Sequence, residues 1–294
     1  MQSESQPQPY ADDASLLTPN SFVQVFDVDF DGLYKFPNGL DDIRKERVQG
    51  FLIRNVMPAE FCQEVVDRLE RKDIEFLELS FQKTYGAQLL GRPVDMSVTL
   101  EQYFQESRQF RDACRALFKG GPDYEGRIEE VCRRIGGGRS VQVPPARTPE
   151  EGSYTSATIR VLPPGGQIGV HCGNEAMHRK TYDHLNTMIE NIDQISYFLT
   201  LNPPEGGGEL VIFSLRYDQI DSTMMNKEGN RCFVDNIIDR YQKVAVRPRR
   251  GDLLIFDGGR YFHLVSHVQG AKTRWTIGGF MGFGRDDKSL YYWS

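Results

Sequence analysis

The second half of the chain alternates short apolar runs with turn residues. The runs are rich in Val, Ile, Tyr and Phe and are separated by Gly, Pro, Asn or Asp, a pattern typical of β-strands joined by tight turns. We expect eight strands, at 154–163, 167–172, 194–202, 208–216, 241–248, 251–259, 261–268 and 274–283. This spacing predicts a mainly β fold with flanking helices, a double-stranded β-helix of the jelly-roll or cupin-like type. A parallel α/β fold is disfavoured, because helices do not alternate with the strands.

The first half shows helical periodicity instead. Apolar residues three and four positions apart predict helices at 58–71, 100–118 and 122–138, after one strand at 48–56. Pro58 suits a first helical position. One more helix is expected at 181–192, between the strands. We therefore expect a flexible tail over 1–20 and a single domain over 21–294, whose helical part, to about residue 150, braces a jelly-roll core at 151–294.

Composition and charge exclude several classes of protein. The 294 residues include 39% hydrophobic and 26% charged residues, which is typical of a globular chain with a sizeable core. The net charge of −6 argues against a nucleic-acid polymer as partner. No apolar run approaches the roughly 18 residues of a membrane span, and the N-terminus lacks the features of a secretory signal. The five cysteines are scattered and form no CxxC pair, which favours a cytoplasmic location.

Histidines and one arginine give the first indication of chemistry. An isolated histidine is usually a surface residue or a hydrogen-bonded core residue, but here three residues follow a definite order. His171 ends an early strand, His263 lies in a late strand, and Arg274 begins the last strand. His267 shares a strand face with His263, so periodicity does not separate these two. His184, inside the predicted helix, suits packing or capping.

This order resembles that of the iron(II)/2-oxoglutarate oxygenases, in which two histidines and a carboxylate hold iron and an arginine pairs with the far carboxylate of 2-oxoglutarate. The resemblance implies that His171 and His263 are iron ligands, and it favours His263 over His267. It also implies that Arg274 anchors 2-oxoglutarate, with Arg160 as a second candidate. The chemistry agrees, because Fe(II) suits imidazole and oxygen ligands with open positions and a guanidinium binds a carboxylate bidentately. Fe(II), 2-oxoglutarate and O2 are the expected cofactors.

Gly173 stands two positions after His171, where such an iron site usually has a carboxylate. A triad with Ala or Gly in that place resembles the halogenating branch of the family, in which chloride or bromide takes the open iron position. An anionic side chain would fill the space and repel a halide. Gly173 is therefore a candidate catalytic residue, and chloride an expected cofactor. Two alternatives stay open: a plain turn glycine, or a carboxylate supplied by Glu175, Asp252 or Asp257.

Longer segments extend the resemblance. They are ATIRVL (157–162), HCGNE (171–175), DQISYF (193–198), GGGELVIFSL (206–215), RRGDLLIFDGGRYFH (249–263) and IGGFMGF (277–283). From about residue 50 onward the chain is similar to the standalone halogenases of the hapalindole and welwitindolinone alkaloid pathways and to related nucleotide halogenases. This implies a free small-molecule substrate and no carrier protein. Ser196 is expected to line the pocket near iron, while Ile195 and Tyr197 face the core. The tail and residues 217–240 match poorly and carry no prediction.

The segment after the first iron ligand suggests the class of substrate. EAMHRKTY (175–182) has three consecutive basic residues, His178, Arg179 and Lys180, where the alkaloid enzymes are expected to present an apolar lid. A cationic cluster at a pocket mouth suits a phosphate or a carboxylate. We therefore expect a phosphorylated small molecule, such as the purine deoxynucleotide deoxyadenosine monophosphate. The alternatives are an indole terpenoid alkaloid as substrate, an ordinary hydroxylase, and a jelly-roll module without catalysis.

Overall fold

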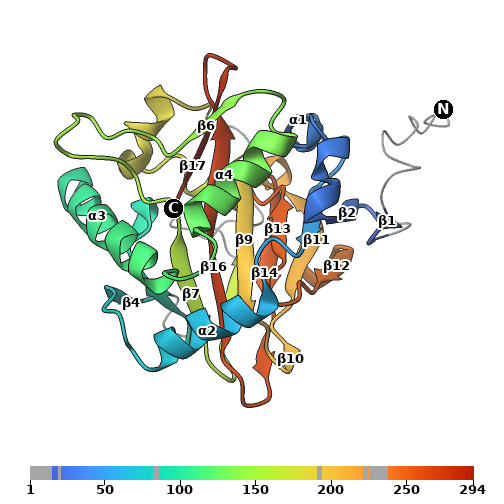
Figure 1. Ribbon diagram of the computed structural model, residues 1–294. Helices are drawn as coiled ribbons and strands as arrows, with labels where there is room; N and C mark the ends of the chain where they lie inside the picture. Colours follow the sequence, from blue (N-terminus) through green and yellow to red (C-terminus); the bar gives the residue numbers. More distant parts are fainter. Residues whose placement is uncertain are drawn as a thin grey trace.

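The computed structural model of the chain describes residues 15–18, 21–81, 86–97, 99–190, 194–220, 224 and 238–294. Most of the predicted tail lies outside these residues. An 11-stranded sheet forms the centre of the fold (Figure 1). Its order is β1 (Ser15–Leu16), β2 (Val25–Asp29), β3 (Gly50–Arg54), β13 (Leu253–Phe256), β9 (Ile195–Asn202), β16 (Arg274–Phe283), β7 (Thr158–Leu162), β5 (Gln88–Leu90) and β4 (Glu78–Ser80). Two further strands lie off this path: β17 (Ser289–Trp293) pairs with β16, and β6 (Ser140–Gln142) pairs with β17.

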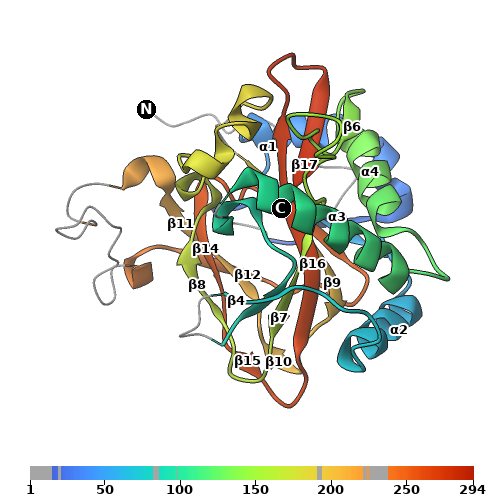
Figure 2. The same cartoon turned by 90° about the vertical axis from the view of Figure 1, so that its left-hand side faces the viewer.

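A smaller sheet faces the large one. Its strand order is β12 (Lys243–Val246), β11 (Leu210–Arg216), β14 (Tyr261–Val265) and β8 (Ile168–His171), and β10 (Gly206–Gly207) pairs separately with β15 (Val268–Gln269). Leu254 and Phe256 of the large sheet share a buried cluster with Leu210 and Ile212 of the small one. Figure 2 shows β8, β11 and β14 on the side of the large sheet opposite α2 and α4. The predicted jelly-roll class is confirmed.

The helices cover the outer face of the large sheet. α2 (Ala59–Glu70), α3 (Leu100–Leu117) and α4 (Tyr124–Ile135) form at the predicted places, and a short α1 (Gly39–Arg44) precedes them. The hydroxyl of Thr99 caps α3 and the carboxylate of Asp123 caps α4, each by accepting a backbone N–H of the first turn. Val65 of α2 and Val131 of α4 belong to the same buried cluster as Leu199 of β9. The division of the chain into a tail and one domain stays a prediction.

Strand β9 is buried along its whole length, and its two faces have different roles. Ile195 and Tyr197 lie in the cluster under the helices, as predicted, and Leu199 lies there too. Ser196 and Phe198 point the other way and line a cavity between the two sheets. Because side chains alternate along a strand, the same strand carries the hydrophobic core on one face and polar chemistry on the other.

The helix predicted at 181–192 is wrong for residues 181–190, and the last two positions lie outside the described residues. The segment forms two short 3-10 helices, η5 (Lys180–Tyr182) and η6 (Leu185–Thr187). Its apolar positions are buried all the same: Tyr182, Leu185 and Ile189. The Thr187 hydroxyl donates to the His184 carbonyl at 2.7 Å, and the Glu190 N–H donates to the Phe283 carbonyl at 2.9 Å. These bonds compete with the α-helical pattern, so the segment follows the end of β16.

Several short elements have no counterpart in the sequence prediction. Strands β2, β4, β5, β6 and β17 extend the large sheet on both sides of the predicted set. The remaining 3-10 helices of the described residues are η1 (Phe30–Lys35), η3 (Val94–Met96), η4 (Gly173–Glu175), η7 (Tyr217–Gln219) and η9 (Ile238–Arg240). In the described part of the chain, every helix is too short or too polar to cross a lipid bilayer.

Candidate active site

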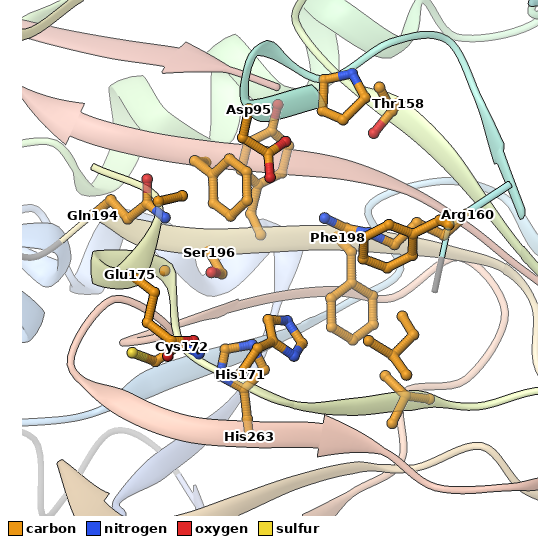
Figure 3. Close-up of a pocket in the computed structure, with 18 of the residues that line it drawn as sticks. Asp95, Thr158, Arg160, His171, Cys172, Glu175, Gln194, Ser196, Phe198 and His263 are labelled. Carbon is orange, nitrogen blue, oxygen red and sulfur yellow. Dashed lines mark hydrogen bonds between the residues drawn. The ribbon is translucent and has the colours of Figure 1, made fainter. Parts of the chain in front are cut away.

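A cavity of about 280 Å³ lies between the inner faces of the two sheets (Figure 3). The small sheet contributes His171 and His263 to its wall, and the large sheet contributes Ser196, Arg160 and Arg274. All five were predicted as site residues from the sequence. The fold therefore brings together, in one cavity, residues that are spread over more than a hundred positions of the chain.

The two histidines face each other across a pair of strands. β14 pairs with β8 in antiparallel register, with the Cα of His263 opposite that of His171. Their ring centres are 4.3 Å apart. Nδ1 of His171 lies 2.8 Å from the Gly169 carbonyl, and Nδ1 of His263 lies 2.9 Å from the Tyr261 carbonyl. A carbonyl only accepts, so Nδ1 carries the hydrogen in both rings, and Nε2 is the nitrogen that has the lone pair.

This pair fits a metal ion. Two imidazoles bound at about 2.1 Å in adjacent positions of one ion bring their ring centres to roughly 4–5 Å, as observed here. A carbonyl behind each Nδ1 is the usual support of a metal-binding histidine. His267, the rival to His263, lies beyond the end of β14, is exposed, and places its Nδ1 3.1 Å from the Gly165 carbonyl. The structure thus sets His263, and not His267, beside His171.

The carboxylates that could complete a triad have other partners. Asp252 accepts from the Arg249 N–H at 2.8 Å and from Arg54 at 2.5 Å, and Asp257 is paired with Arg260 at 2.7 Å. Neither aspartate lines the cavity. Glu175 does line it, but its Oε2 accepts from the Cys172 N–H at 3.2 Å, which caps the turn. Among the described residues, no three His, Cys, Asp or Glu side chains are grouped to hold a metal.

Gly173 opens the turn that follows His171. Its N–H donates to the Gly258 carbonyl at 2.7 Å, which fixes it beside the cavity. A Cβ on residue 173 would lie 2.9 Å from both Cγ and Cδ of Gln194, and closer still to the amide nitrogen of that side chain. The space where a side chain of residue 173 would begin is therefore occupied by Gln194. This close approach, and not a positive φ, is what requires glycine here.

Two arginines lie on the inner face of the large sheet. Arg274 is 4% exposed, stacks on the Phe198 ring at 5.3 Å, and its Nη1 donates to the Thr276 hydroxyl at 3.4 Å. Burial, and then the neighbouring Arg160 guanidinium, lower the pKa of Arg274 to about 9. Burial likewise lowers the pKa of Arg160, with Asp95 opposing the shift. No carboxylate of the described residues forms a salt bridge with either arginine, so both are suited to bind an added anion.

The three consecutive basic residues, His178, Arg179 and Lys180, have different surroundings in the structure. Arg179 lines the cavity, but its Nη1 is 3.0 Å from an Asp95 carboxylate oxygen, so its charge is largely neutralised. His178 is exposed and stacks on Tyr217 with ring centres 6.4 Å apart. Lys180 is also exposed, and neither His178 nor Lys180 belongs to the cavity wall. The predicted cationic cluster is therefore reduced to Arg179.

Two residues of the wall, Asp95 and Gln194, were missed from the sequence. Asp95 lies in η3, far from the other site residues in the chain, and no local pattern indicates its position. Burial raises the pKa of Asp95, with Arg179 and then Arg160 opposing the shift. Gln194 had a usable signal, because strand alternation places residues 194, 196 and 198 on one face.

Solved structures with the same fold are enzymes that use 2-oxoglutarate. An N-substituted L-amino acid dioxygenase from Burkholderia ambifaria AMMD is 15% identical and has a TM-score of 0.53, over 86% of this chain and 90% of that one. The non-heme alpha ketoglutarate dependent epimerase SnoN of nogalamycin biosynthesis is 11% identical, with a TM-score of 0.51, over 86% and 85%. A complex of that epimerase with Fe3+, alpha ketoglutarate and nogalamycin RO is 12% identical, with a TM-score of 0.50, over 90% and 87%.

These likenesses define the class: the chain has the jelly-roll fold of the 2-oxoglutarate-dependent non-haem iron oxygenases. The sequence profile of the carrier-protein-independent halogenase WelO5 matches residues 22–294. The chain therefore belongs to this family of halogenases. No curated protein matches it.

The histidine pair gives the first prediction. His171→Ala and His263→Ala should each lower the affinity for Co(II), a coloured substitute for Fe(II), by more than about 100-fold, because each removes a ligand and not only its support. His267→Ala is the matched control and should bind Co(II) like the wild type. The visible absorption of the Co(II) complex measures all three. Loss of binding in His267→Ala with retention in His263→Ala would reverse the assignment.

Proposed function

We propose that the protein is an Fe(II)/2-oxoglutarate-dependent halogenase that chlorinates an unactivated aliphatic carbon of a free small molecule. The observation that carries this proposal is the His171–His263 pair, flanked by Gly173 where a carboxylate would stand. Membership of the carrier-protein-independent halogenase family supports it. When bound, Fe(II) with 2-oxoglutarate, O2 and chloride supplies the oxidant that removes a hydrogen atom from the substrate and the halogen that replaces it.

His171 and His263 would hold the metal through Nε2. The carbonyls of Gly169 and Tyr261 keep each Nδ1 protonated and fix the ring orientation. His263 is 5% exposed and meets the Phe256 ring edge-on at 5.0 Å, so its rotamer is set by packing before any metal arrives. A site with only two protein ligands leaves more positions for the cosubstrate and a halide than a triad does.

Arg274 would bind the far carboxylate of 2-oxoglutarate. Its guanidinium is held in a low-dielectric place by Phe198 and Thr276, and a planar fork there favours a bidentate carboxylate over water. Arg160 lies on the neighbouring strand β7, where its Cα is paired with Thr276 of β16, and it adds a second positive charge. Two cations side by side suit a dianion, and binding it would relieve their mutual repulsion.

For the substrate we propose a phosphorylated small molecule, with a purine deoxynucleotide such as deoxyadenosine monophosphate as the leading case. Its support is Arg179 at the cavity wall, with Arg160 nearby. Asp95 works against it, because an incoming phosphate would have to displace that carboxylate from Arg179. A second candidate, an indole terpenoid alkaloid, is favoured by the apolar part of the wall, which includes Phe81, Leu89, Pro93 and Phe280.

Arg274 can be tested through the cosubstrate. Arg274→Ala should weaken 2-oxoglutarate binding by about 2–5 kcal/mol, because it removes a buried charged partner. Arg274→Lys should also raise the 2-oxoglutarate requirement steeply, since an ammonium cannot bind a carboxylate bidentately. Conversion of 2-oxoglutarate to succinate over a range of concentrations measures the effect. Arg147→Lys, an exposed arginine outside the cavity wall, is the control. An unchanged requirement in Arg274→Lys would contradict the assignment.

Gly173 can be tested by restoring the carboxylate. Gly173→Asp alone would collide with Gln194, so the informative variant is Gly173→Asp combined with Gln194→Ala. The new carboxylate would take the halide position, and two negative charges about 4 Å apart repel by about 4 kcal/mol near a protein surface. Mass spectrometry of products from nucleotides and indole alkaloids, in saturating chloride, should show chlorination by the wild type and hydroxylation by the double variant.

The single variant Gln194→Ala is the control for that experiment and should still chlorinate when chloride is saturating. Chlorination by a well-folded double variant would contradict the role of Gly173. A wild type that only hydroxylates in saturating chloride would contradict halogenation itself. The panel also separates the two substrate classes, because only one of them should be turned over with chloride incorporation.

Ser196 is expected to influence which group is transferred. Its hydroxyl lies on the cavity face of β9, in the wall that faces the histidine pair, and packs against Gly258. A hydrogen bond from this hydroxyl would orient the oxidant relative to the halide. Ser196→Ala should therefore raise the proportion of hydroxylated over chlorinated product, measured by mass spectrometry at equal turnover. An identical product ratio would count against this role.

A further inference from the structure

We propose that the side-chain amide of Gln194 binds the halide, by donating its Nε2 hydrogens to an anion held beside Gly173. The inference rests on the proposed function, since it concerns the halide of the same site. Gly173 accounts only for the space that the anion needs. Gln194 would add a protein group that binds the anion directly.

Gln194 is placed for this role by the start of β9. The residue precedes Ile195, the first residue of the strand, and its side chain shares the cavity face with Ser196. The amide meets Gly173 so closely that no side chain could begin there. Figure 3 shows Gln194 and Ser196 on one side of the histidine pair, with Arg160 on the other side. The amide therefore occupies the region from which a carboxylate of residue 173 would reach the metal.

The amide of Gln194 is also buried without a partner. The residue is 1% exposed, and within the described residues neither Nε2 nor Oε1 has a hydrogen-bond partner. A buried polar group left in this state costs about 1–3 kcal/mol, so nearly all such groups in folded proteins are satisfied. A glutamine kept here, at the wall of a cavity, indicates a ligand that accepts the hydrogens of its Nε2.

The chemistry of the site selects an anion as that ligand. The histidine pair is suited to a dication, and with that ion bound the neighbouring arginines would add to its positive charge and favour an anion. A neutral amide donates a hydrogen bond to an anion without adding charge of its own. A carboxylate in the same place would repel the anion. Gly173 and Gln194 therefore act as one unit, in which a neutral donor stands where an anionic ligand would.

The test measures halide binding and not turnover. Without O2, the Fe(II)·2-oxoglutarate complex of each variant is titrated with chloride and with bromide, and the shift of its visible charge-transfer absorption gives a Kd. Gln194→Ala should weaken chloride binding by about ten- to 100-fold, the loss expected for a hydrogen bond to a charged group. Gln194→Glu, which has the same shape, should abolish the chloride shift. Gln142→Ala, an exposed glutamine on β6, is the matched control and should bind chloride like the wild type.

Each outcome decides the proposal. If Gln194→Ala binds chloride within twofold of the wild type, the inference is wrong and the proposed halogenase stands. If the wild type forms the Fe(II)·2-oxoglutarate band but binds no halide, both fail. If Gln194→Ala loses the band itself while Gln194→Glu, which keeps a side-chain oxygen, retains it, Oε1 is a metal ligand and the halide role is wrong. Should Gln194→Ala fail to fold, as judged by circular dichroism, Gln194→Met, which is of similar size but has neither an amide nor a charge, decides: an unchanged chloride Kd overturns the inference, and a Kd about ten- to 100-fold weaker supports it.

Discussion

The antiparallel register of β8 and β14 is the constraint on which the site depends. With the Cα of His263 opposite that of His171, both imidazoles leave the small sheet on the same face and at the same level. A slip of one residue would turn one ring to the opposite face, so the pair exists only in this register. The core between the sheets, which includes Leu254 and Ile212, holds this face against the inner side of β9 and β13. The arginines and Ser196 then face the histidines without further adjustment.

The cavity wall combines two arginines with few acidic side chains that are available to neutralise them. Two guanidinium groups are buried on one wall, and burial lowers the pKa of both. Such groups are costly unless an anion meets them, so the proposed binding of anionic ligands would stabilise this wall. The wall's two acids, Asp95 and Glu175, have partners of their own, the first in a salt bridge with Arg179 and the second in the turn after Cys172. Negative charge is thus left for the ligands to supply.

The sequence predicts the core of the fold well, because the pattern of the inner strands is local. β16 forms over residues 274–283 as predicted, and β9 differs by one residue at its start. The helix predicted at 181–192 is wrong over residues 181–190, although the apolar side chains of Tyr182, Leu185 and Ile189 are buried there. Periodicity reports which face is buried, but the backbone there is decided by bonds to β16 and by polar side chains.

For the site, the limits lie in contacts between distant residues. Alternation could not choose between His263 and His267; the resemblance favoured His263, and the strand pairing places it opposite His171. Arg179 belongs to a basic run in the sequence, yet a residue more than eighty positions earlier, Asp95, neutralises it. The contact between Gln194 and Gly173 has the same character. Neither residue forms a recognisable pattern with its neighbours in the sequence. Their contact is seen only in the folded chain.

A glycine next to a metal-binding histidine is usually understood as empty space. In this fold the direction of the missing side chain is filled by an amide, so the glycine exchanges an anionic ligand for a neutral donor. This has a geometric consequence, because the donor belongs to the segment that begins β9. Gln194 and Ser196 are two residues apart on one face, so their Cα atoms are separated by roughly 7 Å. The group that would hold the halide and the hydroxyl that would orient the oxidant are therefore fixed to one strand. Their separation is a property of the sheet, so in the proposed mechanism the geometry of β9 would influence the choice between halogen and hydroxyl transfer.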